Sequence, residues 1–271
     1  MAAAFGDRLV AAGREYGRLC VGIDPHAALL EAWGLADTVD GLRAFSEICV
    51  EAFAGRVALV KPQVAFYERF GAAGFAVLEG TLASIRGRDT LVVADAKRGD
   101  IGSTMAGYAA AWLAPDGPLE ADALTLTPYL GVGSLEPAIA LAGEHGKGVF
   151  VMAANSNPEA EQFQSQTVGG VSIAQQMVDA CAELNRSNSQ NGVGDTGVVV
   201  GATVARPPRL DELNAVVLMP GVGAQGATLD DVSRVAGDAA HLVFPNVSRS
   251  VLAAGPDARE LRKRARELAK R

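Results

Sequence analysis

At 271 residues, the chain is long enough to bury the core of one large α/β domain or of two small ones. Its formal net charge of −7 argues against a general binder of nucleic acids or membrane surfaces, which would be basic. An anionic small molecule remains a possible ligand wherever a site is locally basic, and the 49% of hydrophobic residues is ordinary for a soluble globular protein.

Residue types that bind metals or form disulfides are few and scattered. Neither C-x-x-C nor zinc-site spacing occurs among Cys20, Cys49, Cys181, His26, His145 and His241. Three scattered cysteines, an odd number, predict reduced, mostly buried thiols in a cytoplasmic protein. The first apolar run ends at Phe5, which is too short for a signal peptide, and no stretch approaches a membrane span.

Short apolar runs alternate with helical patterns along the chain. After a lead-in helix over 3–16, the predicted strands are 19–23, 57–60, 91–94, 123–126, 148–152, 197–201, 215–219 and 241–244. The predicted helices are 40–53, 74–85, 101–112, 135–142, 171–184, 209–213, 228–235 and 257–270, and 157–168 and 187–192 are predicted loops. Eight such units over about 250 residues are typical of a closed (β/α)8 barrel, here a single domain over 1–271.

The densest chemistry follows the third predicted strand. Asp95 and Lys97 are two residues apart, so at an extended strand end their side chains point the same way. Gly99 breaks the strand, and Asp100 stands at the next helix start, with Thr104 on the same face. A lysine between two carboxylates is favoured as an ammonium, which predicts a proton donor. A plain salt bridge is the alternative, but barrel enzymes place their chemistry at this end of their strands.

Two earlier predicted strands also end in charged residues. Asp24 follows 19–23 and precedes a proline, so it is either a turn residue or a ligand contact. Lys61 follows 57–60, where a rim lysine whose stem covers apolar surface is as good an interpretation as a functional one. Position alone assigns neither residue.

Two late loops predict a phosphate site. The stretch 219–226 is rich in glycine, exposes backbone N–H groups and adds the side-chain amide of Gln225. The stretch 246–250 follows the last strand and supplies Arg249, a fixed cation suited to phosphate oxygens. Phosphate sites in barrels recur after the seventh and eighth strands, so a phosphorylated ligand is expected.

Taken together, these segments resemble the orotidine 5′-phosphate decarboxylase family. The matching motifs are Gly-Ile-Asp-Pro at 22–25, Lys-Pro-Gln at 61–63, Asp-x-Lys-x-x-Asp-Ile-x-x-Thr at 95–104, Pro-Gly-x-Gly-Ala-Gln-Gly at 220–226 and Asn-x-Ser-Arg at 246–249. The resemblance is to the bacterial subgroup with longer chains. It implies removal of CO₂ from C6 of orotidine 5′-monophosphate to give UMP, the last step of de novo pyrimidine nucleotide synthesis, without a metal or organic cofactor.

The resemblance also implies roles at the reacting end of the substrate. Lys97 would protonate C6, and Asp95 would lie against the departing carboxylate. Lys61 would hold the charged array in register and contact the ribose. Asp24 would bind the ribose hydroxyls.

At the rest of the substrate, the resemblance implies that Ser156 bonds to the pyrimidine and that Pro220 lines its pocket. Gln225 and Arg249 would hold the phosphate. The remaining matching residues would reach into the neighbouring subunit's site, which predicts a homodimer with shared active sites; they are Asp100, Ile101 and Thr104.

Three other functions are weighed against this one. A sugar-phosphate decarboxylase or epimerase on a similar barrel shares the Asp-x-Lys-x-x-Asp element, but many such enzymes need a metal, and the two phosphate-loop motifs would be unexpected there. A non-catalytic nucleotide-binding protein could have lost Lys97 or an aspartate, yet all are present. A purely structural homodimer leaves the phosphate loops unexplained.

Overall fold

The computed structural model describes residues 4–188, 192–222 and 226–270, and its centre is a closed barrel of eight parallel strands. Around the barrel, the order is β1, β10, β9, β8, β5, β4, β3 and β2. The strand bounds are Cys20–Ile23 (β1), Leu59–Pro62 (β2), Leu91–Arg98 (β3), Ala123–Leu126 (β4), Gly148–Ala154 (β5), Gly194–Val200 (β8), Ala215–Pro220 (β9) and Val243–Val247 (β10). The predicted (β/α)8 barrel is confirmed.

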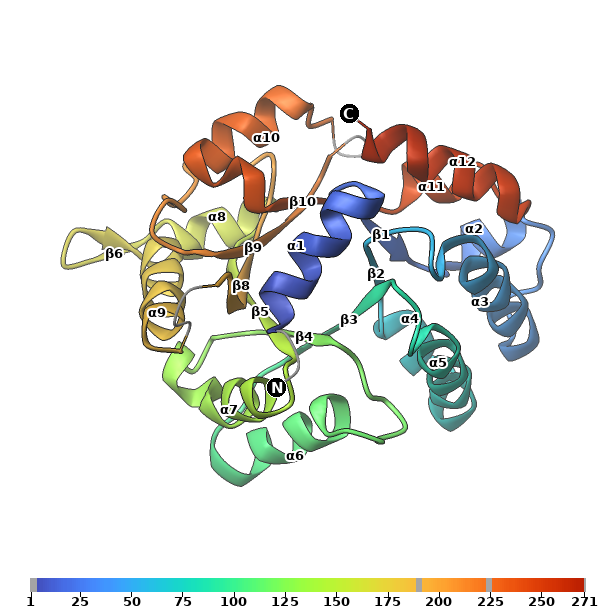
Figure 1. The fold of residues 1–271 in the computed structure, drawn as a ribbon, viewed down its shortest axis with the longest axis horizontal. Helices are drawn as coiled ribbons and strands as arrows, with labels where there is room; N and C mark the ends of the chain where they lie inside the picture. Colours follow the sequence, from blue (N-terminus) through green and yellow to red (C-terminus); the bar gives the residue numbers. More distant parts are fainter. Residues whose placement is uncertain (1–3, 189–191, 223–225, 271) are drawn as a thin grey trace.

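Helices surround the barrel, as Figure 1 shows. The long ones are α3 (Val39–Phe53), α5 (Gly71–Ile85), α6 (Gly102–Leu113), α7 (Glu136–Glu144), α9 (Ile173–Asn188), α10 (Leu229–Ala236) and α12 (Ala258–Ala269). Shorter ones are α2 (Ala27–Ala32), α4 (Ala65–Glu68), α8 (Pro158–Gln164) and α11 (Arg249–Leu252), with 3₁₀ turns η1 (Val132–Leu135) and η2 (Gly237–Leu242). Within the described residues, no helix is both long and apolar enough to cross a bilayer.

The lead-in helix α1 (Phe5–Tyr16) lies across one end of the barrel (Figure 1). Its apolar face packs on the residues that fill the barrel interior, and the ring of Phe5 meets that of Phe150 edge-on at 5.9 Å between centroids. A Cβ on Gly148 would lie 2.1 Å from the Phe5 ring, so only glycine fits there. Because α1 closes the amino end of the strands, a ligand can enter only at the carboxyl end.

A β-bulge between β3 and β4 shapes that open end. Ala94 pairs with Leu124 and Arg98 pairs with Leu126, so three residues of β3 face a single residue of β4. Bulges re-aim side chains and are common beside active sites. The strand therefore runs on to Arg98 instead of ending at residue 94, and it carries Asp95 and Lys97 within its length.

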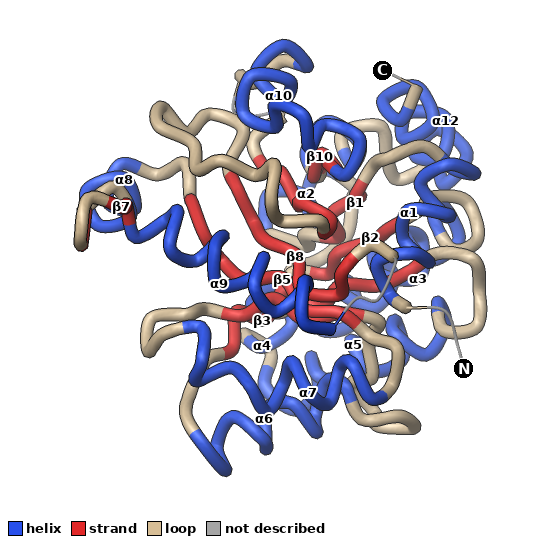
Figure 2. The backbone as a smooth tube through the Cα atoms, turned by 60° about the vertical axis from the view of Figure 1, so that its left-hand side comes forward, coloured by secondary structure: helices blue, strands red, loops and turns tan. Residues whose placement is uncertain are grey.

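Three local predictions are wrong. Residues 157–168, predicted as a loop, contain α8. A hairpin of β6 (Thr167–Val168) and β7 (Val171–Ser172) follows α8 at the periphery of the molecule (Figures 1 and 2). No described residue of 209–213 is helical. Residues 241–242 belong to η2, and the last strand starts at Val243. Part of the predicted loop 187–192 lies outside the described residues.

Candidate active site

A cavity of about 440 Å³ opens at the carboxyl end of the barrel. Every one of the eight barrel strands, or the loop that follows it, contributes to the lining. The lining residues are Asp24, His26, Lys61, Gln63, Phe66, Asp95, Lys97, Thr125, Met152, Asn155, Ser156, Asn157, Val199, Leu218, Pro220, Gly221, Val222, Asn246, Ser248 and Arg249. The cavity thus holds most of the residues that the sequence singled out.

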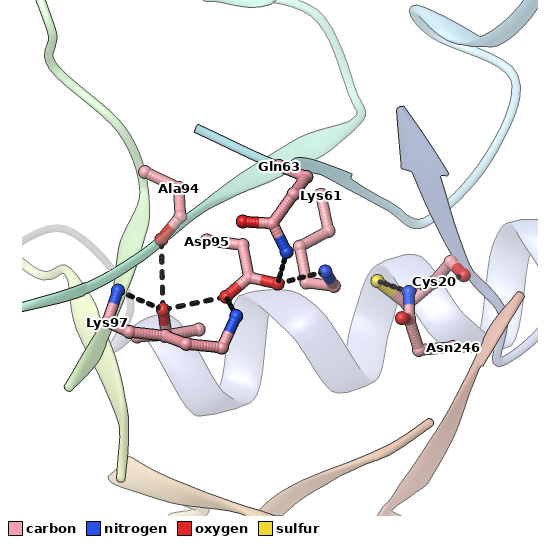
Figure 3. A network of polar contacts seen from close by, with 8 residues as sticks. Cys20, Lys61, Gln63, Ala94, Asp95, Lys97 and Asn246 are labelled. Atoms are coloured by element: carbon pink, nitrogen blue, oxygen red, sulfur yellow. Dashed lines mark hydrogen bonds and ion pairs between the residues drawn. The ribbon is translucent and has the colours of Figure 1, made fainter. Parts of the chain in front are cut away.

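The Asp95 carboxylate on β3 is the hub of this cavity (Figure 3). Its Oδ1 accepts hydrogen bonds from Lys97 Nζ at 2.6 Å and from Thr125 Oγ1 at 3.0 Å. Its Oδ2 accepts from Gln63 Nε2 at 3.0 Å and forms an ion pair with Lys61. Four donors saturate the lone pairs of one carboxylate, so its orientation is fixed from all sides.

Electrostatics keep both charges of the Asp95–Lys61 pair in place. Burial alone would raise the pKa of Asp95, but the ammonium groups of Lys61 and Lys97 outweigh it and hold that pKa well below its usual range. Burial alone would lower the pKa of Lys61, yet the Asp95 and Asp24 carboxylates hold it above its usual value. At neutral pH, Asp95 is therefore a permanent carboxylate and Lys61 a permanent ammonium.

The Lys97 backbone has a left-handed conformation, with φ at +49°, which is uncommon for a residue other than glycine. Its side chain is 41% exposed, whereas the Lys61 side chain is 10% exposed. Lys97 therefore reaches from the hub toward the open part of the cavity. Both lysines line the cavity, and Lys97 is the more exposed of the two, so it is the one better placed to exchange protons with water.

Asp24, just after β1, lines the cavity, and one oxygen of its carboxylate is an unused acceptor. Its Oδ1 is buried, and no described residue donates a hydrogen bond to it. A buried carboxylate oxygen without a donor is costly, so a ligand hydroxyl placed there would be bound favourably.

Cys20 lies in β1, and burial raises the pKa of its thiol to about 12. The Asn246 amide is 3.2 Å from its sulfur (Figure 3). At neutral pH the residue is a thiol, which excludes a thiolate nucleophile at this site.

After β10, Arg249 opens α11 and Ser248 precedes it, and both residues line the cavity. A Cβ on Gly22 would lie 1.9 Å from Ser248 Oγ, so glycine in β1 lets this loop approach the strand closely. Arg249 has no ion-pair partner among the described residues, which leaves its charge for a ligand. Gln225, the other predicted phosphate contact, lies outside the described residues.

Ser156 and Pro220 also line the cavity. The segment around Ser156 is held by α8, because the Gln164 amide bonds Asn155 in both directions, at 2.7 Å to its backbone N and 3.1 Å to its side-chain oxygen. The helix that the sequence failed to predict therefore supports this part of the cavity lining.

Comparison with known proteins agrees with the geometry. The family model of the orotidine 5′-phosphate decarboxylase / HUMPS family matches residues 17–264. The chain belongs to this family. Orotidine 5′-phosphate decarboxylases of Corynebacterium glutamicum (strain R) and Corynebacterium efficiens are each 62% identical to it, over 95% and 97% of this chain and 94% of each relative. A crystal structure of a provisionally assigned orotidine 5′-phosphate decarboxylase from Streptomyces avermitilis has 51% identity and a TM-score of 0.95, covering 99% of this chain and 94% of that one.

Three residues of the family motif do not join the cavity. Asp100 Oδ1 accepts a hydrogen bond from its neighbour's N–H, Ile101 N, at 2.8 Å. Ile101 is 61% exposed, and Thr104 is exposed on the first turn of α6. The prediction that Lys97 lies between the Asp95 and Asp100 carboxylates is therefore wrong for a single chain. Among the described residues, Lys97 forms an ion pair with Asp95 alone.

Two contacts of the hub escaped the sequence analysis. Gln63 was noted only as part of a motif, and Thr125 only as part of a strand. The signal for Thr125 was its hydroxyl in an otherwise apolar, fully buried strand, because a buried hydroxyl must find a partner. For Gln63, no local sequence pattern predicts a contact with Asp95, because the two residues meet only through the pairing of neighbouring strands in the barrel.

Proposed function

We propose that this cavity converts orotidine 5′-monophosphate into UMP and CO₂. The observation that carries the proposal is the hub of Lys61, Asp95 and Lys97 in the same cavity as Arg249, which has no ion-pair partner among the described residues. It supplies an ammonium proton donor at one end and a phosphate-binding cation at the other. Family membership and the 62% identical decarboxylases support the same reaction.

In this reaction, the bond between C6 of the pyrimidine and the carboxyl carbon breaks, and its electron pair stays on C6 as CO₂ leaves. Lys97 Nζ delivers a proton to C6, which completes UMP, and its exposed side chain then takes a proton from water. The developing carbanion has no electron sink in the ring, so the barrier must fall through charges that are already in place. The saturated Asp95 carboxylate keeps the Lys97 ammonium aimed and, lying against the substrate carboxylate, favours its departure.

The rest of the substrate fits the other groups. Asp24 Oδ1, which lacks a donor, would accept from a ribose hydroxyl, and Lys61 lies beside it. Ser156 and Pro220 would contact the pyrimidine, and Arg249 together with Gln225 would bind the phosphate. Binding energy from the phosphate, far from C6, can then be used to position the carboxylate.

We further propose a homodimer with shared sites, in which Asp100, Ile101 and Thr104 enter the partner's cavity. Support comes from their exposure beside the cavity, together with the exposed apolar Tyr129 (78%) and Leu130 (55%) at the same rim. Mixing inactive Lys97→Ala and Asp100→Asn chains tests this. Half of the dimers would then be hybrids with one intact site each, so about a quarter of wild-type activity should return. No recovery after demonstrated subunit exchange would contradict shared sites.

Three further expectations accompany the function. The reaction should need no metal or organic cofactor, and no nucleic-acid or membrane partner is expected for a chain of net charge −7. A cytoplasmic location is proposed because all three cysteines are buried and unpaired.

The substrate assignment is tested by the absorbance change of the pyrimidine as purified protein consumes orotidine 5′-monophosphate, with EDTA present. Turnover under these conditions is expected. Activity only on a sugar phosphate, and only with added divalent metal, would favour the sugar-phosphate enzymes. A folded protein that binds UMP without turning over the substrate would favour a binding protein.

A further inference from the structure

Thr125, in the middle of β4, is the residue that faces the β3 bulge. It stands alone opposite Asp95, Ala96 and Lys97, because the pairing of the two strands resumes only at Arg98. Its side chain is almost completely buried, at 1% exposure, and it also lines the cavity. A buried hydroxyl at this point must be bonded to the bulge itself.

The hydroxyl bonds both parts of the catalytic hub. Thr125 Oγ1 accepts a hydrogen bond from the backbone N–H of Lys97 at 2.9 Å. Its single proton goes to Asp95 Oδ1 at 3.0 Å, since the competing carbonyl oxygen of Ala94 is 3.5 Å away. One atom, Thr125 Oγ1, therefore connects the backbone of Lys97 to the carboxylate that pairs with the Lys97 ammonium.

This connection matters because the Lys97 backbone is left-handed. For a residue with a Cβ, this conformation is unfavourable, and surrounding contacts must hold it. On the amino side of Lys97, its backbone N–H donates to the Thr125 hydroxyl. On the other side, Thr127 Oγ1 donates to the Lys97 carbonyl oxygen at 3.2 Å, but it has no contact with the carboxylate.

We propose that Thr125 is a positioning residue for the decarboxylation: its hydroxyl holds the Lys97 backbone and the Asp95 carboxylate in one register, so that the ammonium is aimed at C6. The inference rests on the proposed function. Without the hydroxyl, the cavity and the direct bond between the Lys97 ammonium and Asp95 remain, but the Lys97 backbone and the Asp95 carboxylate no longer share a bonding partner. A misplacement of the reacting groups by about 1 Å can cost on the order of 100-fold in rate.

The test compares Thr125→Ser, which keeps the hydroxyl, with Thr125→Ala, which lacks it. Both lose the same methyl group, so the ratio of their kcat values isolates the hydroxyl. We expect kcat of the serine variant to lie within about 5-fold of wild type and that of the alanine variant to fall about 100-fold. The dissociation constant for UMP should stay within about 3-fold in both, because the phosphate contacts carry that binding.

Thr90 supplies a matched control at the amino end of β3. Its buried hydroxyl, 2% exposed, donates to the carbonyl of Val57 and accepts from Gly55 N, far from the cavity. Thr90→Ala should lower the melting temperature by a similar amount to Thr125→Ala but leave kcat unchanged. A loss of rate in both would assign the effect to weakened folding.

Three outcomes would overturn the proposal: equal kcat values for the Thr125→Ser and Thr125→Ala variants, an alanine variant as active as wild type, or a loss of UMP binding that matches the loss of rate. If Thr125→Ala does not fold, Thr125→Val replaces it, because valine keeps the shape of threonine without the hydroxyl. Wild-type turnover is measured first. Its absence would refute the proposed function, whereas wild-type turnover with an unaffected alanine variant would refute only the role of Thr125.

Discussion

Neutralising Asp95 should destabilise the fold as well as stop the reaction. In an Asp95→Asn variant, the amide oxygen can still accept from Lys61 and Gln63, while the new NH₂ group faces the other two donors. Thr125 can turn its hydroxyl to accept, and Lys97 can move into water, since its side chain is 41% exposed. Lys61 cannot leave, because its side chain is only 10% exposed.

Removing one partner of a buried ion pair lowers the free energy of unfolding by about 3–5 kcal/mol. Because Thr125 and Lys97 can rearrange around the new amide, we expect a loss near the lower end, at about 3 kcal/mol. Urea denaturation at pH 7 measures the difference. The double variant Lys61→Met/Asp95→Asn removes both charges of the buried pair, so it should be more stable than the sum of the single changes predicts, by at least about 1 kcal/mol.

Glu120→Gln is the matched control. It neutralises the carboxylate that pairs at 2.7 Å with the buried Lys147, outside the cavity, so it should lower stability and leave kcat intact. The reasoning is refuted if Asp95→Asn is as stable as wild type, or if the double variant shows no coupling between the two sites.

Three further predictions concern pH, phosphate and packing. The pKa of Asp95 is lower in the folded protein than in the unfolded chain, so the stabilisation by this carboxylate is complete above about pH 5 and is lost on acidification. In urea denaturation at several pH values between about 5 and 2, the free energy of unfolding should therefore fall more steeply for wild type than for Asp95→Asn. Parallel curves for the two proteins would contradict this. Arg249→Ala should raise KM for orotidine 5′-monophosphate about 10- to 100-fold and weaken UMP more than uridine in calorimetric titrations, whereas equal effects on both ligands would remove Arg249 from the phosphate site. Gly22→Ala should weaken UMP binding, because the added Cβ would push Ser248 away. Gly143→Ala is the control and should bind UMP normally, because the space around Gly143 is open. Identical binding by both variants would show that the close approach of Ser248 to Gly22 is unimportant.

The barrel could be predicted because each strand contains a short apolar run and most of its residues are buried. Such runs must be covered on both faces, and eight of them alternating with helices leave few other folds. The missed helix α8 shows the converse. None of its residues is buried, so its sequence carries no apolar period, and only Pro158 at its first turn signals a helix.

Within the site, residues at strand ends could be predicted, because parallel strands bring their carboxyl ends together. The contacts that orient them could not. The β3 bulge depends on how two strands pair, and it sets both the left-handed Lys97 and its bond to Thr125. Asp100 was expected beside Lys97 because the two are near in sequence, but the break after β3 directs it toward its own helix start.

The central claim is that the Lys97 ammonium delivers the proton to C6. The most direct measurement is kcat of Lys97→Ala on orotidine 5′-monophosphate with EDTA present, alongside its dissociation constant for UMP. The account predicts that kcat falls at least about 10⁴-fold, as it does when a group acting only in the transition state is removed, while UMP binding changes little. A Lys97→Ala variant that binds UMP and retains wild-type turnover would contradict it.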